Sequence, residues 1–322
     1  MNDQVSVSII MPCYNCQDLL EETLQSLEDQ TCQNFEVICI NDGSADRTAE
    51  VLKAWKEKGT LDITVIDKKN AGVSAARNDG IRAAKGEYVI FLDSDDAYHE
   101  AYIEKMLEAL ESSGADVAYC RVDRKYDTVM NISAAEISCK PQSQTEAMEN
   151  LLYRMGEFSF CCYVYRAELL QKQDLRFDCN TKFGEDREFN WKYLCHCSSA
   201  CFVDAPLYWY RVNHQSATRA KASWRKTDLL HAVKRIEKYL QEHNCQYSAE
   251  FNSYMYARAM WAVAKTFAVS KDAELFERLR KEFDVKSCMK VTKKDRSKLV
   301  AIASWAYLIH PKLFYTLIGL KK

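Results

Sequence analysis

The sequence has little net charge and no large excess of basic residues. Its 322 residues include 44 Lys and Arg against 46 Asp and Glu, which gives a formal net charge of -2. Nucleic-acid binding depends on clustered Lys and Arg that neutralise phosphates. The near balance therefore argues against nucleic acid as a partner.

With 48% hydrophobic residues, the chain can bury the core of one large domain or two ordinary ones.

The chain also lacks a signal-peptide pattern, a low-complexity linker and an internal repeat. Its 14 cysteines match neither a secreted disulfide framework nor a CxxC pair with a second half. Cys13 and Cys16 form a lone CxxC, and a zinc site at Cys195, Cys197 and Cys201 is the less favoured alternative. Free thiols in a reducing cytoplasm are expected.

Up to about residue 120, apolar runs alternate with helical patterns. The expected strands are 5–10, 35–40, 62–66, 87–92 and 115–120. The expected helices are 17–30, 45–59, 72–86 and 98–113. The strands are apolar on both faces, which indicates a sheet covered on both sides. This alternation predicts an α/β fold with a doubly wound, mostly parallel sheet.

The rest of the chain has a different texture. Between about 121 and 215 the pattern is mixed, with helices expected near 144–155 and 185–195 and short strands within 200–211. Beyond Ser223 the pattern is helical throughout. We therefore expect a helical C-terminal region after the α/β part.

Polar clusters follow three of the expected strands. They are PCYN at 12–15, NDGS at 41–44 and DSDD at 93–96. In doubly wound sheets, ligands bind at the carboxyl ends of the strands. The three clusters are therefore expected to converge on one site.

The DSDD cluster places Asp93, Asp95 and Asp96 at the end of an apolar strand. Like charges this close repel one another and raise each other's pKa, unless a cation or a positive helix end offsets them. A D-x-D pair offers the hard oxygen ligands that Mg²⁺ or Mn²⁺ prefers, and these ions bridge phosphates. The alternative is an acidic helix start, which is favoured by about 0.3–1 kcal/mol.

In NDGSADRT, a plain turn into a helix explains Gly43, Ser44 and Asp46 but gives Asp42 no role. A carboxylate at this strand end can accept hydrogen bonds from a nucleobase or ribose. Arg77, early in the next helix, can reach the same crevice and pair with a diphosphate. A solvated surface arginine is the alternative.

The segment FGEDREF, 183–189, starts another expected helix with Glu185 and Asp186. One interpretation is an N-terminal cap. The other is a general base, because a carboxylate beside a bound sugar can deprotonate an attacking hydroxyl.

Five ordered segments are more specific together than any one of them alone. They are SVSIIMPCYNC, FEVICINDGSADRT, NAGVSAARNDGIRAAKGEYVIFLDSDD, FGEDREF and YRVNHQSATR. With them the chain closely resembles the family 2 inverting glycosyltransferases of the GT-A fold, of bacterial surface-glycan type. The resemblance spans roughly residues 5–219, about two thirds of the chain.

The resemblance implies a GT-A catalytic domain at 1–220, with a nucleotide-sugar and metal half at 1–120 and an acceptor half at 121–220. A helical region at 221–322 would follow. The implied activity is transfer of a hexosyl or N-acetylhexosaminyl group from a nucleotide-diphosphate donor, expected to be a UDP-sugar. The implied acceptor is a hydroxyl of a glycan or lipid-linked glycan.

Family roles transfer to matching positions. Asp186 is implied as the catalytic base, with Glu185 beside it, and inversion follows from a single displacement. Asp95 and His214 are implied as ligands of a divalent cation, Mn²⁺ or Mg²⁺. The implied nucleotide-sugar-binding residues are Pro12, Tyr14, Asp42, Arg77, Asp93, Ser94, Arg211 and Ser216. Arg219 is a further candidate in the same loop as His214.

One segment departs from the family. Relatives commonly carry Trp and Lys in a W-x-K-x-Y-R pattern, where this chain has Cys161 and Tyr163. That segment borders the acceptor in relatives, so the acceptor's identity does not transfer. Two alternatives stay open: a non-catalytic nucleotide-sugar-binding or scaffold protein, and a sugar nucleotidyltransferase. The latter would favour a Gly-rich basic loop where this chain has PCYNCQDLL.

The segment 297–322 is apolar and aromatic, with Lys at both ends. Pro311 divides it, and neither half has the roughly 20 residues of a spanning helix. Two interpretations remain: a helix packed on the catalytic domain, or a peripheral membrane anchor. The expected location is the cytoplasm, at the inner face of the cell membrane if the anchor exists. The pattern does not indicate an oligomeric state.

Overall fold

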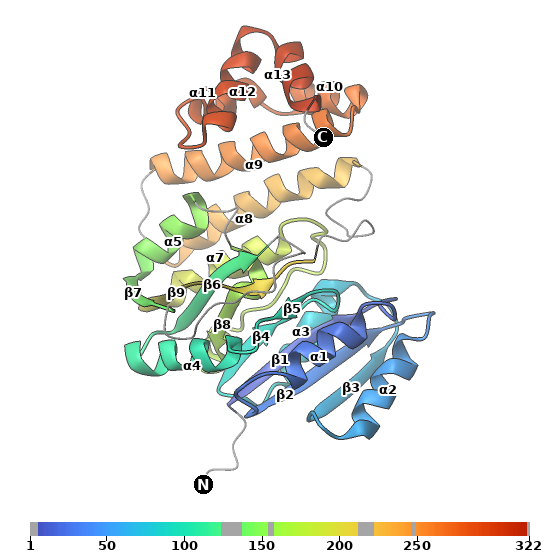
Figure 1. Ribbon diagram of the computed structural model, residues 1–322. Helices are drawn as coiled ribbons and strands as arrows, with labels where there is room; N and C mark the ends of the chain where they lie inside the picture. Colours follow the sequence, from blue (N-terminus) through green and yellow to red (C-terminus); the bar gives the residue numbers. More distant parts are fainter. Residues whose placement is uncertain (1–5, 124–136, 154–157, 212–221, 246–248, 321–322) are drawn as a thin grey trace. The chain divides into compact units, whose positions relative to one another are not determined.

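The structure is a computed structural model that describes residues 6–123, 137–153, 158–211, 222–245 and 249–320 (Figure 1). The chain forms two compact units. One contains the described residues of Met1–Cys179 and Phe189–His214, and the other contains those of Asn180–Glu188 and Gln215–Lys322. The first unit holds the β-sheet and the second is helical.

The sheet unit begins with four parallel strands in the order β3-β2-β1-β4. Their bounds are β1 Val7–Cys13, β2 Phe35–Asp42, β3 Ile63–Lys68 and β4 Tyr88–Phe91. The connecting helices are α1 Leu20–Glu28, α2 Thr48–Lys58 and α3 Val73–Ala83. Strands β1, β2 and β4 consist almost wholly of buried residues, as strands covered on both faces do. The predicted α/β alternation is confirmed here.

The sheet continues beyond β4 in the order β8-β6-β9-β5, and β7 pairs with β9. The bounds are β5 Ala97–Tyr98, β6 Val117–Asp123, β7 Cys139–Ser143, β8 Tyr163–Arg166 and β9 Ser199–Trp209. Strand β8 runs antiparallel between β4 and β6, whereas β6 and β9 are parallel. The described residues thus form a mixed, mostly parallel sheet of nine strands, in agreement with the predicted fold class.

The remaining helices of this part of the chain are α4 Tyr102–Ser113, α5 Gln144–Tyr153, α6 Ala167–Lys172 and α7 Glu185–His196, with the short helix η2 Phe160–Cys162. An aromatic cluster fills the interior near the end of β4. Phe91 contacts the rings of Phe160, Tyr165, Phe177 and Phe189, and the last two are stacked 4.2 Å apart. Offset and edge contacts of this kind stabilise a core beyond simple burial.

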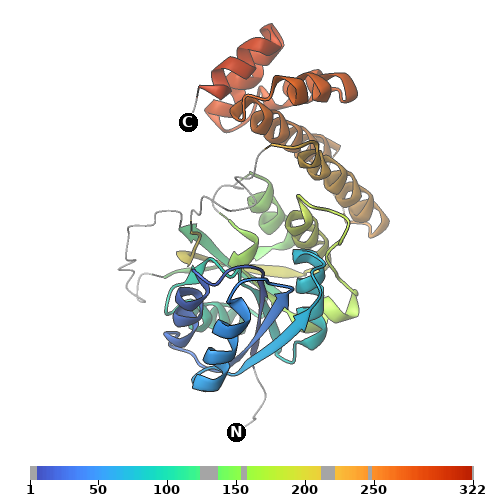
Figure 2. The ribbon, with the colours of Figure 1, turned by 90° about the vertical axis from the view of Figure 1, so that its right-hand side faces the viewer.

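The second unit is helical, as predicted beyond Ser223. Its elements are η3 Trp224–Thr227, α8 Asp228–Glu242, α9 Ala249–Val269, α10 Ala273–Glu282, α11 Val285–Thr292, α12 Lys298–Ile309 and α13 Pro311–Gly319. The long helix α9 packs against α8, α10, α11 and α13 (Figure 2). Within the described ranges, no helix combines the length and the apolar character that a bilayer crossing requires.

Helix α3 approaches strand β1 closely at Gly80. A Cβ atom at this position would lie 2.2 Å from Cγ2 of Ile10, which is fully buried in β1. The absence of a side chain therefore allows this close packing of helix on strand. Since α3 carries Arg77, the contact also sets the height of that candidate residue above the sheet.

We predict that Gly80→Ala destabilises the protein by about 1–3 kcal/mol, because it overpacks the contact with Ile10. In an Ile10→Ala background the contacts to Cγ2 and Cγ1 are removed and only the 3.1 Å contact to Cβ of residue 10 remains, so the same substitution should cost less than about 1 kcal/mol, because helix propensity offsets the remaining crowding. Urea unfolding of the four proteins measures both effects. Equal effects of Gly80→Ala in both backgrounds would contradict the packing argument.

Candidate active site

The loops that follow β1 and β2 are bonded to each other. The backbone N–H of Asn15 donates to Oγ of Ser44 at 3.1 Å, and the N–H of Ala45 donates to Oδ1 of Asn15 at 2.8 Å. Pro12, near the end of β1, is half-buried, while the ring of Tyr14 is 54% exposed. An exposed aromatic ring on a loop that is held by hydrogen bonds can stack on a planar ligand.

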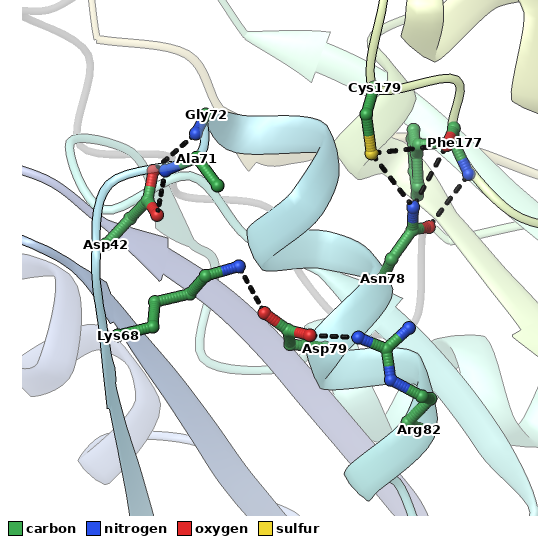
Figure 3. Close-up of polar contacts among 9 residues, drawn as sticks. All are labelled: Asp42, Lys68, Ala71, Gly72, Asn78, Asp79, Arg82, Phe177 and Cys179. Carbon is green, nitrogen blue, oxygen red and sulfur yellow. Dashed lines mark hydrogen bonds and ion pairs between the residues drawn. The ribbon is translucent and has the colours of Figure 1, made fainter.

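Asp42, the last residue of β2, is buried and has a structural role that the sequence pattern did not indicate. Its two carboxylate oxygens accept hydrogen bonds from the N–H groups of Ala71 and Gly72, each at 2.8 Å (Figure 3). Gly72 has a φ of +91° and precedes the first residue of α3. The carboxylate therefore fixes the turn from which α3 starts. Its remaining lone pairs can still accept hydrogen bonds from a ligand.

Helix α3 is also fixed to the segment that follows α6. The side-chain amide of Asn78 donates to the carbonyl oxygen of Phe177 at 2.9 Å, and the N–H of Phe177 donates to Oδ1 of Asn78 at 2.8 Å (Figure 3). On another part of α3, Asp79 pairs with Lys68 of β3. These contacts join segments far apart in the sequence and hold α3 against the sheet unit.

Arg77 is buried rather than solvated, so the surface alternative for this residue is wrong. Only 5% of it is exposed, and its Nη2 lies 2.9 Å from Oδ1 of Asp93. The guanidinium carbon also lies 4.8 Å and 5.3 Å from the ring centres of Phe160 and Phe177. A cation held between aromatic rings and a carboxylate has a fixed position and direction. It thereby offsets part of the negative charge of DSDD.

The other two carboxylates of DSDD have raised pKa values. Burial, followed by the charge of Asp93, raises the pKa of Asp95 to about 6. Burial, followed by the charges of Asp93 and Asp95, raises the pKa of Asp96 to about 8. Asp96 is 1% exposed, and it accepts hydrogen bonds from the hydroxyl of Tyr208 and, at 2.8 Å, from the N–H of Arg211. Asp96 thus connects DSDD to the end of β9.

Arg211, immediately beyond β9, supplies a second buried guanidinium close to DSDD. It is 5% exposed, its Nη2 lies 2.5 Å from Oε2 of Glu22 in α1, and its charge lowers the pKa of Asp95. Ser94 takes part through its backbone, because its carbonyl oxygen accepts a hydrogen bond from the hydroxyl of Thr23 at 3.1 Å. The structure therefore places Arg77, Asp93, Ser94, Asp95 and Arg211 around the carboxyl end of β4.

Three candidates, His214, Ser216 and Arg219, lie outside the described residues. Within the described ranges, no group of three or more His, Cys, Asp or Glu side chains is arranged to hold a metal ion. An Mg²⁺ or Mn²⁺ ion in a nucleotide site commonly takes one or two carboxylates and completes its shell with phosphates and water. Asp95, separated by one residue from the carboxylate of Asp93, has the oxygen ligands that such a shared site requires.

Glu185 and Asp186 begin α7, as predicted, in the part of that helix that belongs to the helical unit. Oδ1 of Asp186 accepts a hydrogen bond from the N–H of Arg187 at 2.6 Å. Two residues after Asp186, the buried Glu188 accepts hydrogen bonds at 3.1 Å and 2.7 Å from Nε and Nη2 of Arg235 in α8. This bidentate pair fixes the start of α7 on α8.

The segment that departs from the family pattern is buried. Cys161 and Tyr163, at the positions of the family's Trp and Lys, are each 1% exposed. The hydroxyl of Tyr98 donates to the carbonyl oxygen of Cys161 at 2.9 Å. Neither side chain offers a surface to an acceptor. All 14 cysteines are free thiols, as expected.

A family model described as glycosyl transferase family 2 matches residues 8–173, just over half of the chain. The chain belongs to glycosyltransferase family 2. It is 34% identical over 217 residues to the uncharacterized glycosyltransferase EpsJ of Bacillus subtilis (strain 168). That alignment covers 66% of this chain and 62% of EpsJ, so the chain spans less than two thirds of that relative.

Solved structures share the fold at low sequence identity. S. aureus TarS 1-349 in complex with UDP-GlcNAc matches with a TM-score of 0.68 and 18% identity, over 98% of this chain and 88% of that chain. The mannosyltransferase PcManGT of Pyrobaculum calidifontis, in complex with GDP-Man and Mn²⁺, matches with a TM-score of 0.57 and 15% identity, over 98% and 87%. This family 2 chain therefore has a GT-A-like fold.

We predict that Asp42→Asn destabilises the protein by about 1–3 kcal/mol, because the asparagine oxygen can accept from only one of the N–H groups of Ala71 and Gly72, and its NH2 group then faces the other. The matched control is Asp67→Asn. Asp67 is exposed and accepts from Asn41 through one oxygen, which an asparagine can reproduce, so its effect should stay within about 0.5 kcal/mol. Urea unfolding compares the two. Equal losses would refute the special role of Asp42.

We predict that the metal-free protein loses stability as the pH rises from about 4 to about 8. An unfolded aspartate releases its proton near pH 4, whereas Asp95 and Asp96 in the folded chain hold theirs to about 6 and about 8. Across this window the folded state binds more protons, so a rising pH favours unfolding. Urea unfolding at several pH values measures the slope. Asp96→Asn should flatten it, and an unchanged slope would contradict the assignment.

Proposed function

We propose that this glycosyltransferase is an inverting, metal-dependent enzyme that takes its sugar from a UDP-sugar. The proposed acceptor is a hydroxyl of a glycan or lipid-linked glycan. The main support is the charge arrangement at the end of β4, where Arg77 and Arg211 are held beside Asp93 and Asp95. A site with this mixture of charges suits a diphosphate bound together with a cation.

In the proposed donor complex, the exposed ring of Tyr14 stacks on the nucleobase and the adjacent Pro12 lines the same pocket. Asp42 accepts hydrogen bonds from the base with the lone pairs that Ala71 and Gly72 leave free. Asp93 and Ser94 lie toward the ribose. The UDP-GlcNAc complex of TarS supports uridine as the base.

The nucleoside diphosphate is the leaving group of the donor, and negative charge develops on it as the bond to the sugar breaks. Asp95 would hold the divalent cation, together with His214 from the segment outside the described residues. When bound, the cation neutralises the charge that develops on the leaving diphosphate. Arg77 and Arg211 orient the donor beside the cation. Ser216 is also assigned to binding of the donor. The Mn²⁺ complex of the mannosyltransferase PcManGT supports a divalent cation in this fold.

Asp186 is assigned as the general base. It takes the proton from the acceptor hydroxyl while that oxygen attacks the anomeric carbon from the side opposite the diphosphate. The bond to the diphosphate breaks as the new glycosidic bond forms, so a single displacement inverts the configuration. Glu185 is the neighbouring carboxylate. The pair between Glu188 and Arg235 keeps the start of the helix in place.

The bound sugars of the two solved relatives support a hexosyl or N-acetylhexosaminyl group. We assign catalysis to residues 1–220 and a separate role to 221–322, although the base segment Asn180–Glu188 groups with the helical unit. A lipid-linked acceptor would place the enzyme in the cytoplasm at the inner face of the cell membrane. A non-catalytic nucleotide-sugar-binding protein is the alternative, and it would bind UDP without turnover.

We predict that Asp186→Asn lowers turnover by about 10²–10⁴-fold, because the general base is lost, while the affinity for UDP stays within about twofold. UDP release from UDP-GlcNAc and UDP-glucose measures turnover, and calorimetric titration measures UDP binding. The matched control is Glu185→Gln, at the adjacent position. A large loss in that variant with none in Asp186→Asn would move the base assignment to Glu185.

We predict that Asp95→Ala loses the part of UDP binding that depends on Mn²⁺, because the cation loses its protein ligand. Titration of UDP with and without Mn²⁺ separates this effect from simple unfolding, since metal-independent binding should persist. Metal-dependent binding that survives in Asp95→Ala would remove Asp95 from the metal site.

A further inference from the structure

The C-terminal part of the chain is strongly basic, although the chain as a whole is not. Residues 285–322 contain eight lysines and one arginine but a single acidic residue, Asp295. This gives the segment a net charge of +8 in a chain of -2, so the other 284 residues carry -10. Helices α11, α12 and α13 lie in this segment, and we call them the tail helices.

Two of the tail helices expose large apolar side chains. In α12, Ile302, Trp305 and Ile309 are 60%, 52% and 74% exposed. Their spacing of three and four residues places them on one face of the helix. The opposite face is buried and includes Val300, Ala303, Ser304 and Tyr307.

Helix α13 and the residue that follows it repeat this arrangement. Leu313, Leu317 and Leu320 are exposed, while Phe314 and Ile318 are buried. Within the described ranges, six of the nine exposed large apolar side chains belong to α12, α13 and Leu320. Single exposed apolar residues are ordinary, but such a concentration marks an interaction surface.

The basic side chains lie next to these apolar faces. Lys298 begins α12 and Lys312 lies in the first turn of α13, and both are exposed. Nζ of Lys293 lies 4.7 Å from the ring centre of Trp305. Asp295 does not offset this charge at the surface, because its side chain is 2% exposed and lies 3.3 Å from Nε of Arg258.

We propose that the tail helices bind the surface of an anionic lipid bilayer, with the exposed faces of α12 and α13 inserted at the interface. Aliphatic and Trp side chains enter the boundary between headgroups and acyl chains, while adjacent lysines contact the lipid phosphates. The helices need not leave their own unit, because their buried faces stay packed on α9 and on one another. Packing and membrane contact are therefore compatible.

Charge favours this partner over a second copy of the chain. A two-fold contact through the same surface would place two segments of +8 against each other. An anionic bilayer instead attracts the segment, with each lysine near the surface contributing about fivefold in affinity. The observations on charge and exposure involve none of the donor-site residues, so this inference stands independently of the proposed function.

The test is flotation of the full chain with vesicles of phosphatidylcholine alone and of an equal mixture of phosphatidylcholine and phosphatidylglycerol. Binding is expected to the anionic vesicles and should weaken by at least tenfold in 0.5 M salt, because screening reduces the attraction of the lysines. The double variant Trp305→Ser, Ile309→Ser should bind about 100-fold more weakly, since two apolar contacts are lost. Both positions are exposed, so the fold should be kept.

Two matched controls isolate the surface. Val269→Ser removes an exposed apolar side chain at the end of α9 and should leave binding unchanged. Replacing Lys290, Lys294 and Lys298 by Gln should weaken binding about 100-fold, whereas replacing the exposed Lys53, Lys56 and Lys172 by Gln should not. Titration of each variant with UDP measures donor binding, which distinguishes a change at the donor site from a change in membrane binding.

Equal flotation of the wild type and the Trp305, Ile309 variant would overturn the proposal, as would equal binding to both vesicle types. No flotation, together with a dimer that the same variant dissociates, would assign the surface to a second copy instead. Membrane binding in a chain that fails to bind UDP would leave this inference intact while removing the proposed function.

Discussion

Three carboxylates crowded at the end of one buried strand are the constraint that organises the sheet unit. Asp93, Asp95 and Asp96 cannot all be charged and buried without compensation. Two buried arginines that are distant from each other in sequence, Arg77 in α3 and Arg211 beyond β9, offset part of this charge, and the raised pKa values of Asp95 and Asp96 favour protonation for the rest. The fold must therefore deliver both guanidinium groups to one place.

The sheet topology meets this requirement. Immediately after DSDD, strand β5 pairs with the end of β9, so that Ala97 lies opposite Trp209 and Tyr98 opposite Tyr208. That register brings the hydroxyl of Tyr208 and the N–H of Arg211 to Asp96. On the other side, Asp42 fixes the start of α3 and so the position of Arg77. Much of what resembles a ligand-binding motif thus also holds the unit together.

Local sequence pattern was sufficient for the first four strands, because each contains a short run rich in apolar residues that is followed by a helix with its own periodicity. It was insufficient for β5 and β8, which contain two and four residues. The two residues of β5 show no period, and β8 pairs with β4 and β6, which lie far away in the sequence. The burial of Arg77 was also unpredictable, because the rings that enclose it come from Phe160 and Phe177. For the tail, the sequence indicated apolar helices but not which faces stay exposed.

The position of β8 also has a consequence for how the chain is made. Strands β1 to β4 and their helices are complete by residue 91, and β1 already supplies the pairing partner of one edge of β4. The other edge of β4, however, pairs with Val164–Arg166 of β8, which are synthesised more than 70 residues later. Domains fold from the N-terminus during synthesis, and an unpaired apolar strand edge invites association with other chains. During synthesis there is therefore an interval in which one edge of β4 has unpaired backbone N–H and C=O groups that can pair with another chain.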